Sequence, residues 1–83
     1  MPCLIMSKSL TSAKRSERVL LQFGIPARVV RPSQELSEKG CGYAVRIDRV
    51  FLGKAVTLLR EHQLPVGRLY EQLSTGGYQE TST

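Results

Sequence analysis

The chain has 83 residues, of which 41% are hydrophobic, and both values are typical of one small globular domain. Such a domain buries only about two-thirds of the surface that its unfolded chain exposes, so we expect no large buried active site with many convergent groups. The net charge of +5 comes from twelve Lys and Arg against seven Asp and Glu, scattered along the chain. Only clustered charge makes a focused field, so a solvated basic surface and attraction of an acidic partner both stay open.

Targeting signals and cofactor motifs are absent from the sequence. No segment has the roughly 18 consecutive apolar residues of a membrane span. Residues 1–6 lack the features of a secretion signal, so we expect no membrane partner and a cytoplasmic location. The two Cys residues are expected to be free thiols in a reducing compartment. With one His they are too few for a zinc site, so we expect no metal and no bound cofactor.

The N-terminal part of the chain predicts a strand followed by a helix. A continuous apolar run at residues 3–7 is typical of a buried strand, and residues 11–23 have the apolar spacing of an amphipathic helix. Gly24 is placed to end this helix in a left-handed conformation. The residues that offer oxygens to cap its first turn are Ser9, Thr11 and Ser12.

The rest of the chain predicts two more strands, a second helix and a last strand. The expected elements are a strand at residues 27–31, a polar loop at 33–40, a strand at 42–48, a helix at 49–63 and a strand at 67–73. Pro26 and Pro32 suit an edge position for the first of these strands, and Asp48 is placed to cap the helix. Residues 74–83 contain Gly76-Gly77 and almost no apolar residue, and they predict a flexible C-terminal tail.

This β-α-β-β-α-β order predicts an α+β domain, a ferredoxin-like two-layer sandwich over residues 1–73. Right-handed crossovers place both helices on one face of an antiparallel sheet, with the spatial order fourth, first, third, second strand. The other face is expected to stay uncovered and to show Ala44 and Arg46, with side chains of the first strand. An exposed apolar patch of this kind is typical of a dimer or partner surface.

The feature that points to chemistry is Cys41, which stands between Gly40 and Gly42. In the predicted topology the third strand begins beside the end of the first strand, near the N-terminus of the first helix. That N-terminus carries about half a positive charge, which favours the thiolate, the nucleophilic form of Cys. Lys39 adds positive field, and the two glycines leave room for a partner's sulfur.

Each of these features also has a structural interpretation. Cys41 is equally consistent with a small buried side chain, and the two glycines with a turn into the strand. His62 is expected at the same end of the sheet, either as a cation at a helix C-terminus or as a base.

Cys3 opens the first strand at the opposite end, roughly 15 Å away for a strand of about five residues. We therefore expect Cys3 to be inert and to form no disulfide with Cys41.

Residues 40–47, GCGYAVRI, resemble the signature of the family called putative selenium/sulfur carrier protein-like. The helix start at residues 9–13 and the Gly24-Ile25-Pro26 turn fit the same family, and the likeness covers residues 3 to about 73. The resemblance implies a carrier rather than a turnover enzyme. Cys41 would accept sulfur or selenium from a protein donor, hold it as a persulfide or perselenide, and present it to a protein acceptor.

Two other functions stay open on the sequence. The uncovered sheet face suits a non-catalytic interaction or regulatory module, or a homodimer formed through that face. RNA binding is compatible with the fold and the basic charge, but it needs exposed aromatic residues on the two central strands. The first strand has none and the third has only Tyr43, which is assigned to the core, so we expect no nucleic-acid binding.

Overall fold

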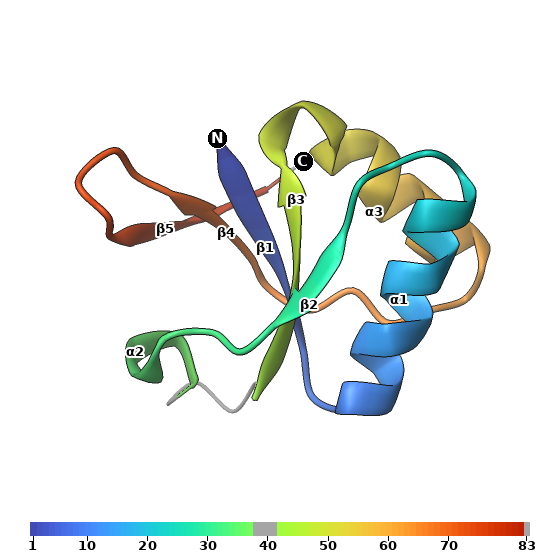
Figure 1. The fold of residues 1–83 in the computed structure, drawn as a ribbon, viewed down its shortest axis with the longest axis horizontal. Coiled ribbons are helices and arrows are strands. Elements are labelled where there is room, and N and C mark those ends of the chain that lie inside the picture. Colours follow the sequence, from blue (N-terminus) through green and yellow to red (C-terminus); the bar gives the residue numbers. More distant parts are fainter. Residues whose placement is uncertain (38–41, 83) are drawn as a thin grey trace.

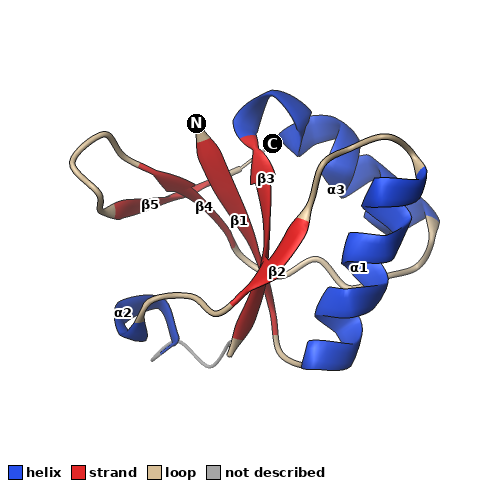
Figure 2. Ribbon diagram, in the orientation of Figure 1, coloured by secondary structure: helices blue, strands red, loops and turns tan. Residues whose placement is uncertain are grey.

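The computed structural model of the chain describes residues 1–37 and 42–82. Its elements are β1 (Pro2–Ser7), α1 (Leu10–Gln22), β2 (Arg28–Val30), α2 (Gln34–Ser37), β3 (Tyr43–Asp48), the 3₁₀ turn η1 (Arg49–Phe51), α3 (Leu52–Glu61), β4 (Leu69–Gln72) and β5 (Tyr78–Thr81). The strands form one sheet, and α1 and α3 lie together on one side of it (Figure 2). The small α2 lies on the other side, which we call the far face (Figure 1). The described elements therefore make an α+β domain with both long helices on one face.

The sheet order is β2-β3-β1-β4-β5, and every neighbouring pair is antiparallel. The strands β1 to β4 stand in the order that the sequence predicts, and β5 makes the sheet one strand wider than the predicted four-stranded sandwich. The sequence predicts only a flexible tail here, and β5 corrects that prediction. A tight turn makes the hairpin, in which Leu73 N–H donates to Gly77 O at 2.7 Å and Gly76 has a φ of +92°. A left-handed φ of this kind is readily available to glycine.

The ends of α1 follow the predicted capping. Ser9 is the N-cap, and its Oγ accepts a hydrogen bond from Ser12 N–H at 3.1 Å. At the other end Gly24 has a φ of +81°, and Ile25 N–H donates to Leu20 O at 2.9 Å. These bonds satisfy backbone groups that have no partner inside the helix, so the position of α1 is fixed at both ends.

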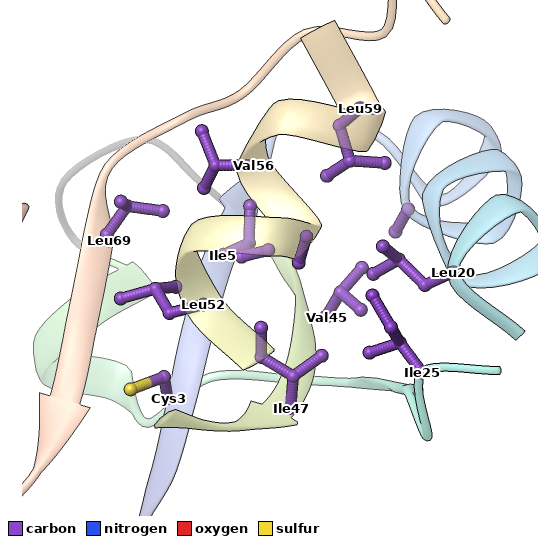
Figure 3. Close-up of a cluster of buried hydrophobic side chains, with 12 residues drawn as sticks. Cys3, Ile5, Leu20, Ile25, Val45, Ile47, Leu52, Val56, Leu59 and Leu69 are labelled. Atoms are coloured by element: carbon purple, nitrogen blue, oxygen red, sulfur yellow. The ribbon is translucent and has the colours of Figure 1, made fainter. Parts of the chain in front are cut away.

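The main core lies between the sheet and the two long helices (Figure 3). Strand residues alternate into it, so β1 contributes Cys3 and Ile5 while β3 contributes Val45 and Ile47, as the sequence predicts for β3. The helical residues that meet them include Leu20, Leu52, Ala55, Val56 and Leu59. Apolar burial of this kind is the main stabilising contribution in a small domain.

The far face carries a second apolar cluster, which corrects the prediction of an uncovered face. Leu4, Met6 and Ala44 are buried there with Tyr70, and Leu36 of α2 packs on them with only 3% of its surface exposed. The predicted polar loop at residues 33–40 therefore contains one helical turn, which presents a leucine to the sheet. Because the chain covers this patch itself, the far face offers no open apolar surface there for a partner or a second copy.

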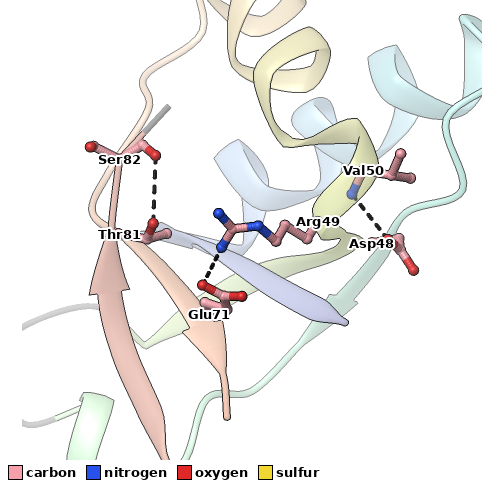
Figure 4. Close-up of polar contacts among 6 residues, drawn as sticks. All are labelled: Asp48, Arg49, Val50, Glu71, Thr81 and Ser82. Atoms are coloured by element: carbon pink, nitrogen blue, oxygen red, sulfur yellow. Dashed lines mark hydrogen bonds and ion pairs between the residues drawn. The ribbon is translucent and has the colours of Figure 1, made fainter.

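Polar contacts fix the turn between β3 and α3 (Figure 4). Asp48 Oδ1 accepts from Val50 N–H at 3.0 Å and so caps η1, as the sequence predicts. That hydrogen bond lowers the pKa of Asp48, and the nearby N-terminal amine lowers it further. The next residue, Arg49, forms an ion pair with Glu71 of β4.

In the part of the chain that the structure describes, no helix is long and apolar enough to cross a membrane.

Candidate functional site

The register of β1 and β3 brings the predicted site elements together. Ser7, the last residue of β1, is the Cα partner of Tyr43, the first residue of β3. Gly42 therefore comes one position beyond this pair, beside the turn that leads into α1. We call this region, with Ser7, Lys8, Ser9, Ser12 and Gly42, the Gly42 end of the sheet. Cys41, Gly40 and Lys39, which the sequence also assigns to the site, lie outside the described residues.

Gly42 is exposed and has no structural need to be glycine. A Cβ built on it would meet no atom of the described residues within 4 Å. Among the described glycines only Gly24 and Gly76 have a positive φ, so the backbone at Gly42 suits any residue. Neither packing nor conformation explains the missing side chain. Its visible consequence is an unobstructed surface at the start of β3.

Gly67 forms the opposite case at the same end of the sheet. A Cβ there would lie 2.3 Å from the backbone oxygen of Met6, closer than any real contact. Met6 N–H donates to Arg68 O at 2.9 Å, so the segment before β4 lies directly against the end of β1. In the sequence Gly67 stands out only as the first residue of the predicted last strand, although a glycine at a strand start is a known signal of close backbone approach.

Two hollows open at or beside the Gly42 end. One of about 420 Å³ lies between the end of β1 and the segment before β4, and Lys8, Ser12 and Val66 are among its lining residues. The other, of about 390 Å³, is lined by Arg31, Pro32, Gln34 and Gly42 itself. A partner's side chains therefore have space on both sides of the start of β3.

The charges at this end of the described structure are positive. The first turn of α1 contains no acidic residue that would offset the helix dipole, and Lys8 is exposed next to it. The Arg31 guanidinium lies 5.3 Å from the centre of the Tyr43 ring, a cation–π distance. The oxygen of Ser9 is engaged as the helix cap, and Thr11 is exposed in the first turn. The arrangement favours anionic groups, a thiolate among them.

His62 lies away from this site, which corrects the sequence prediction. Its ring stacks edge-on against Phe23 with centroids 5.5 Å apart. Phe23 caps the C-terminal end of α1, about 20 Å along a helix of this length from its N-terminus. The helix α3 ends there, and it is the segment 63–68 that returns to the end of β1. His62 therefore serves neither as a base nor as a cation at the Gly42 end.

Cys3 occupies the opposite end of β1, where it is completely buried in the main core (Figure 3). Its Cα partner on β3 is Ile47. Burial raises the pKa of its thiol, and the nearby Glu71 carboxylate raises it further. Ser7 lies four residue steps beyond Cys3 along the extended strand, which corresponds to about 13 Å. Within residues 1–37 and 42–82 no group of three His, Cys, Asp or Glu side chains is arranged to hold a metal ion.

The described structure is thus a small α+β domain with an open, basic strand end beside a capped helix N-terminus. Residues 2–71 of the 83 match the model of the family described as "Putative Se/S carrier protein-like", and the chain belongs to this family. A search of curated proteins and a search of solved structures each found no match. The matched range contains the Gly42 end and all elements from β1 to α3.

Proposed function

We propose that the protein is a carrier of sulfur or selenium, which it holds on Cys41 as a persulfide or perselenide. The observation that carries the proposal is the open, positive surface at Gly42, the residue bonded to Cys41. Membership of a family described as carriers supports the same chemistry. The free space where a Gly42 side chain would stand is what a thiol exchanging atoms with another protein needs.

The transfer chemistry needs only a thiolate and a partner. The Cys41 thiolate attacks the terminal sulfur of a donor persulfide, forms a new S–S bond, and releases the donor thiolate. In delivery, a nucleophile of the acceptor attacks that terminal sulfur, and the Cys41 thiolate leaves. The same steps with selenium give the perselenide. No net oxidant is consumed, and no cofactor takes part besides the covalently held atom.

Positive charge at the Gly42 end supports both the reaction and the choice of partners. The N-terminus of α1, Lys8 and Arg31 stabilise negative charge near the start of β3. The same charges favour acidic docking surfaces on protein donors and acceptors. The carrier chemistry starts from a free Cys41 thiol, and Cys3 is a free cysteine, so we place the carrier in the reducing cytoplasm.

The two other functions receive less support. An interaction module, or a homodimer, that uses an open apolar sheet face lacks that face, since Leu4, Met6 and Ala44 are buried beneath Leu36 and its neighbours. RNA recognition through the central strands needs exposed aromatic rings on β1 and β3. On the far face these two strands present Leu4, Met6, Ala44 and Arg46, and none of these is aromatic.

Intact mass spectrometry tests the proposal. The protein purified without reductant should carry the added mass of one sulfur or one selenium, treatment with inorganic polysulfide should add one sulfur, and dithiothreitol should remove the added atom. Cys41→Ser should abolish the gain, whereas Cys3→Ser is the matched control and should keep it. A loaded atom that persists in Cys41→Ser, or that maps to Cys3, would contradict the proposal.

A further inference from the structure

A pair of arginines lies side by side on the far face, away from the Gly42 end. Arg28 of β2 and Arg46 of β3 are Cα partners, and in paired strands such residues point to the same face. On its other side Arg46 is the partner of Leu4, which belongs to the far-face cluster. Both arginines are exposed, and neither forms an ion pair with any residue that the structure describes.

This arrangement is unfavourable unless something offsets the charge. Like charges directly opposite each other on neighbouring strands destabilise a sheet. Two other arginines next to strands have acidic partners, since Arg49 pairs with Glu71 and Arg68 lies 3.7 Å from Glu80. Arg28 and Arg46 differ from them, because neither has an ion-pair partner among the described residues, so each guanidinium keeps donors that an anion could engage.

A hollow beside Arg46 has the polar groups to receive that anion. It measures about 230 Å³, and its lining includes Arg31, Arg46, Gln72 and Tyr78, over a floor with Pro2 and Leu4. Gln72 and Tyr78 are themselves Cα partners across β4 and β5, so the hairpin positions both side chains. Guanidinium, amide and phenol groups all donate hydrogen bonds, and none of the residues that line this hollow is acidic.

A neighbouring hollow shows why this one is the better site. It is lined by Arg28 and Arg46 but also by Asp48, whose lowered pKa keeps it negatively charged at neutral pH. A carboxylate there would repel a second anion. The acid-free hollow has the volume of about seven or eight water molecules at roughly 30 Å³ each. That is enough for a phosphate group with a short substituent and too little to enclose a nucleotide.

We propose that the far-face hollow at Arg46 binds an oxyanion of the phosphate class, such as a small phosphate monoester. Arg46 supplies the planar guanidinium fork that matches phosphate oxygens. Arg28, the Cα partner of Arg46, adds positive charge from β2 beside the hollow, and Gln72 and Tyr78 donate from the opposite side. The proposal is independent of Cys41 and of sulfur transfer, and it gives the basic surface of the chain a specific ligand.

Titration by ¹H–¹⁵N NMR tests this site on the full chain, with inorganic phosphate and glycerol 3-phosphate as probes against chloride at equal ionic strength. Saturable shifts should centre on Arg46, Gln72 and Tyr78 and leave α1 and α3 unchanged. Arg46→Gln should weaken binding about tenfold or more, because it removes a charge-assisted fork. Tyr78→Phe should weaken it by a smaller factor, since it removes one donor and keeps the ring.

The control variant is Arg60→Gln, which removes an exposed cation from α3 on the other side of the sheet and should leave the affinity unchanged. Unchanged amide shifts of α1 and α3 in each variant show that the fold is intact. Equal losses in Arg46→Gln and Arg60→Gln, or shifts spread over every basic residue, would overturn the site. Tighter binding of hexaglutamate than of either phosphate would also overturn it, in favour of a protein-docking surface.

Discussion

The two ends of the six-residue strand β1 lie in very different surroundings. At its start, Cys3 lies at 0% exposure among the side chains of β3 and α3, and burial raises the pKa of its thiol. At its finish, Ser7 pairs with Tyr43, and the adjacent Gly42 faces open space beside a helix N-terminus. The two ends of the central strands therefore offer opposite environments, an apolar core at one end and an exposed surface at the other.

The comparison also separates two kinds of glycine. Gly67 is required because the backbone of Met6 passes where a side chain would be, whereas no atom of the described residues lies within 4 Å of that position at Gly42. The first glycine shapes the wall of the Gly42 end, and the second leaves its surface open. A substitution at a packed position such as Gly67 should therefore lower the free energy of unfolding. A substitution at the open surface, at Gly42, should change only the rate of sulfur transfer.

The largest expected effect is that of Gly67→Ala. Its Cβ would overlap the Met6 carbonyl oxygen, and relief requires backbone movement, so we expect a loss of about 2–3 kcal/mol in the free energy of unfolding. Urea denaturation followed by circular dichroism measures it. Gly53→Ala is the matched control, since a Cβ on that exposed helical glycine meets nothing, and it should stabilise the fold by up to about 1 kcal/mol. Wild-type stability of Gly67→Ala would contradict the close approach.

The next effect is expected for Cys3→Ser at the buried end. A hydroxyl in this apolar core lacks a hydrogen-bond partner, which costs about 2 kcal/mol. Cys3→Ala introduces no polar group, and it should cost less, about 1 kcal/mol. Thermal unfolding of the two variants isolates the contribution of the hydroxyl. If serine and alanine are equally tolerated, Cys3 is less sealed than its zero exposure indicates.

Asp48 provides a further test at the Cys3 end of β1, where it is the Cα partner of Pro2. Its hydrogen bond from Val50 N–H holds the folded pKa below the ordinary value. Its contribution to stability is therefore present above that ordinary value, about pH 4, and is lost as the pH falls through the folded pKa. Asp48→Asn should be less stable than wild type at pH 7, and the difference should vanish towards pH 2. A difference that stays constant with pH would argue against the charged cap.

The smallest effect on stability is expected for Gly42→Ala. Because the added methyl group enters open space and the backbone is not left-handed, the free energy of unfolding should change by less than about 0.5 kcal/mol. The rate at which Cys41 gains sulfur from polysulfide should nevertheless fall, since the methyl group crowds the approach. A large loss of stability would instead assign Gly42 a structural role.

Much of the fold can be predicted from local patterns. The hydroxyl of Ser9 and the left-handed backbone available to Gly24 identify the two ends of α1, and the alternation through Val45 and Ile47 identifies β3 and its buried face. The juxtaposition of the ends of β1 and β3 follows from the strand order. These features depend on neighbours in sequence or on topology rules, which is why they can be predicted.

The features that the sequence does not reveal depend on tertiary packing. Leu36 is a single apolar residue in a polar stretch, so no period identifies α2, and its burial appears only when the far face is assembled. Tyr78 is likewise isolated, and the turn through Gly76 resembles a mobile tail until β4 offers it a partner. The position of His62 also cannot be predicted from the sequence, because the direction of α3 is set by its packing against α1 and by the contact of His62 with Phe23.

The most direct test of the account is the order in which the two thiols of the native protein react. Iodoacetamide at neutral pH, sampled over time and mapped by peptide mass spectrometry, should label Cys41 first and Cys3 only after the chain is unfolded in urea. Mild oxidation of dilute native monomer should likewise give no linked Cys3–Cys41 peptide, since Cys3 lies at the opposite end of β1 from the Gly42 end. Faster labelling of Cys3, or a clean linked peptide from the folded monomer, would contradict the assignment of Cys41 as the carrier thiol.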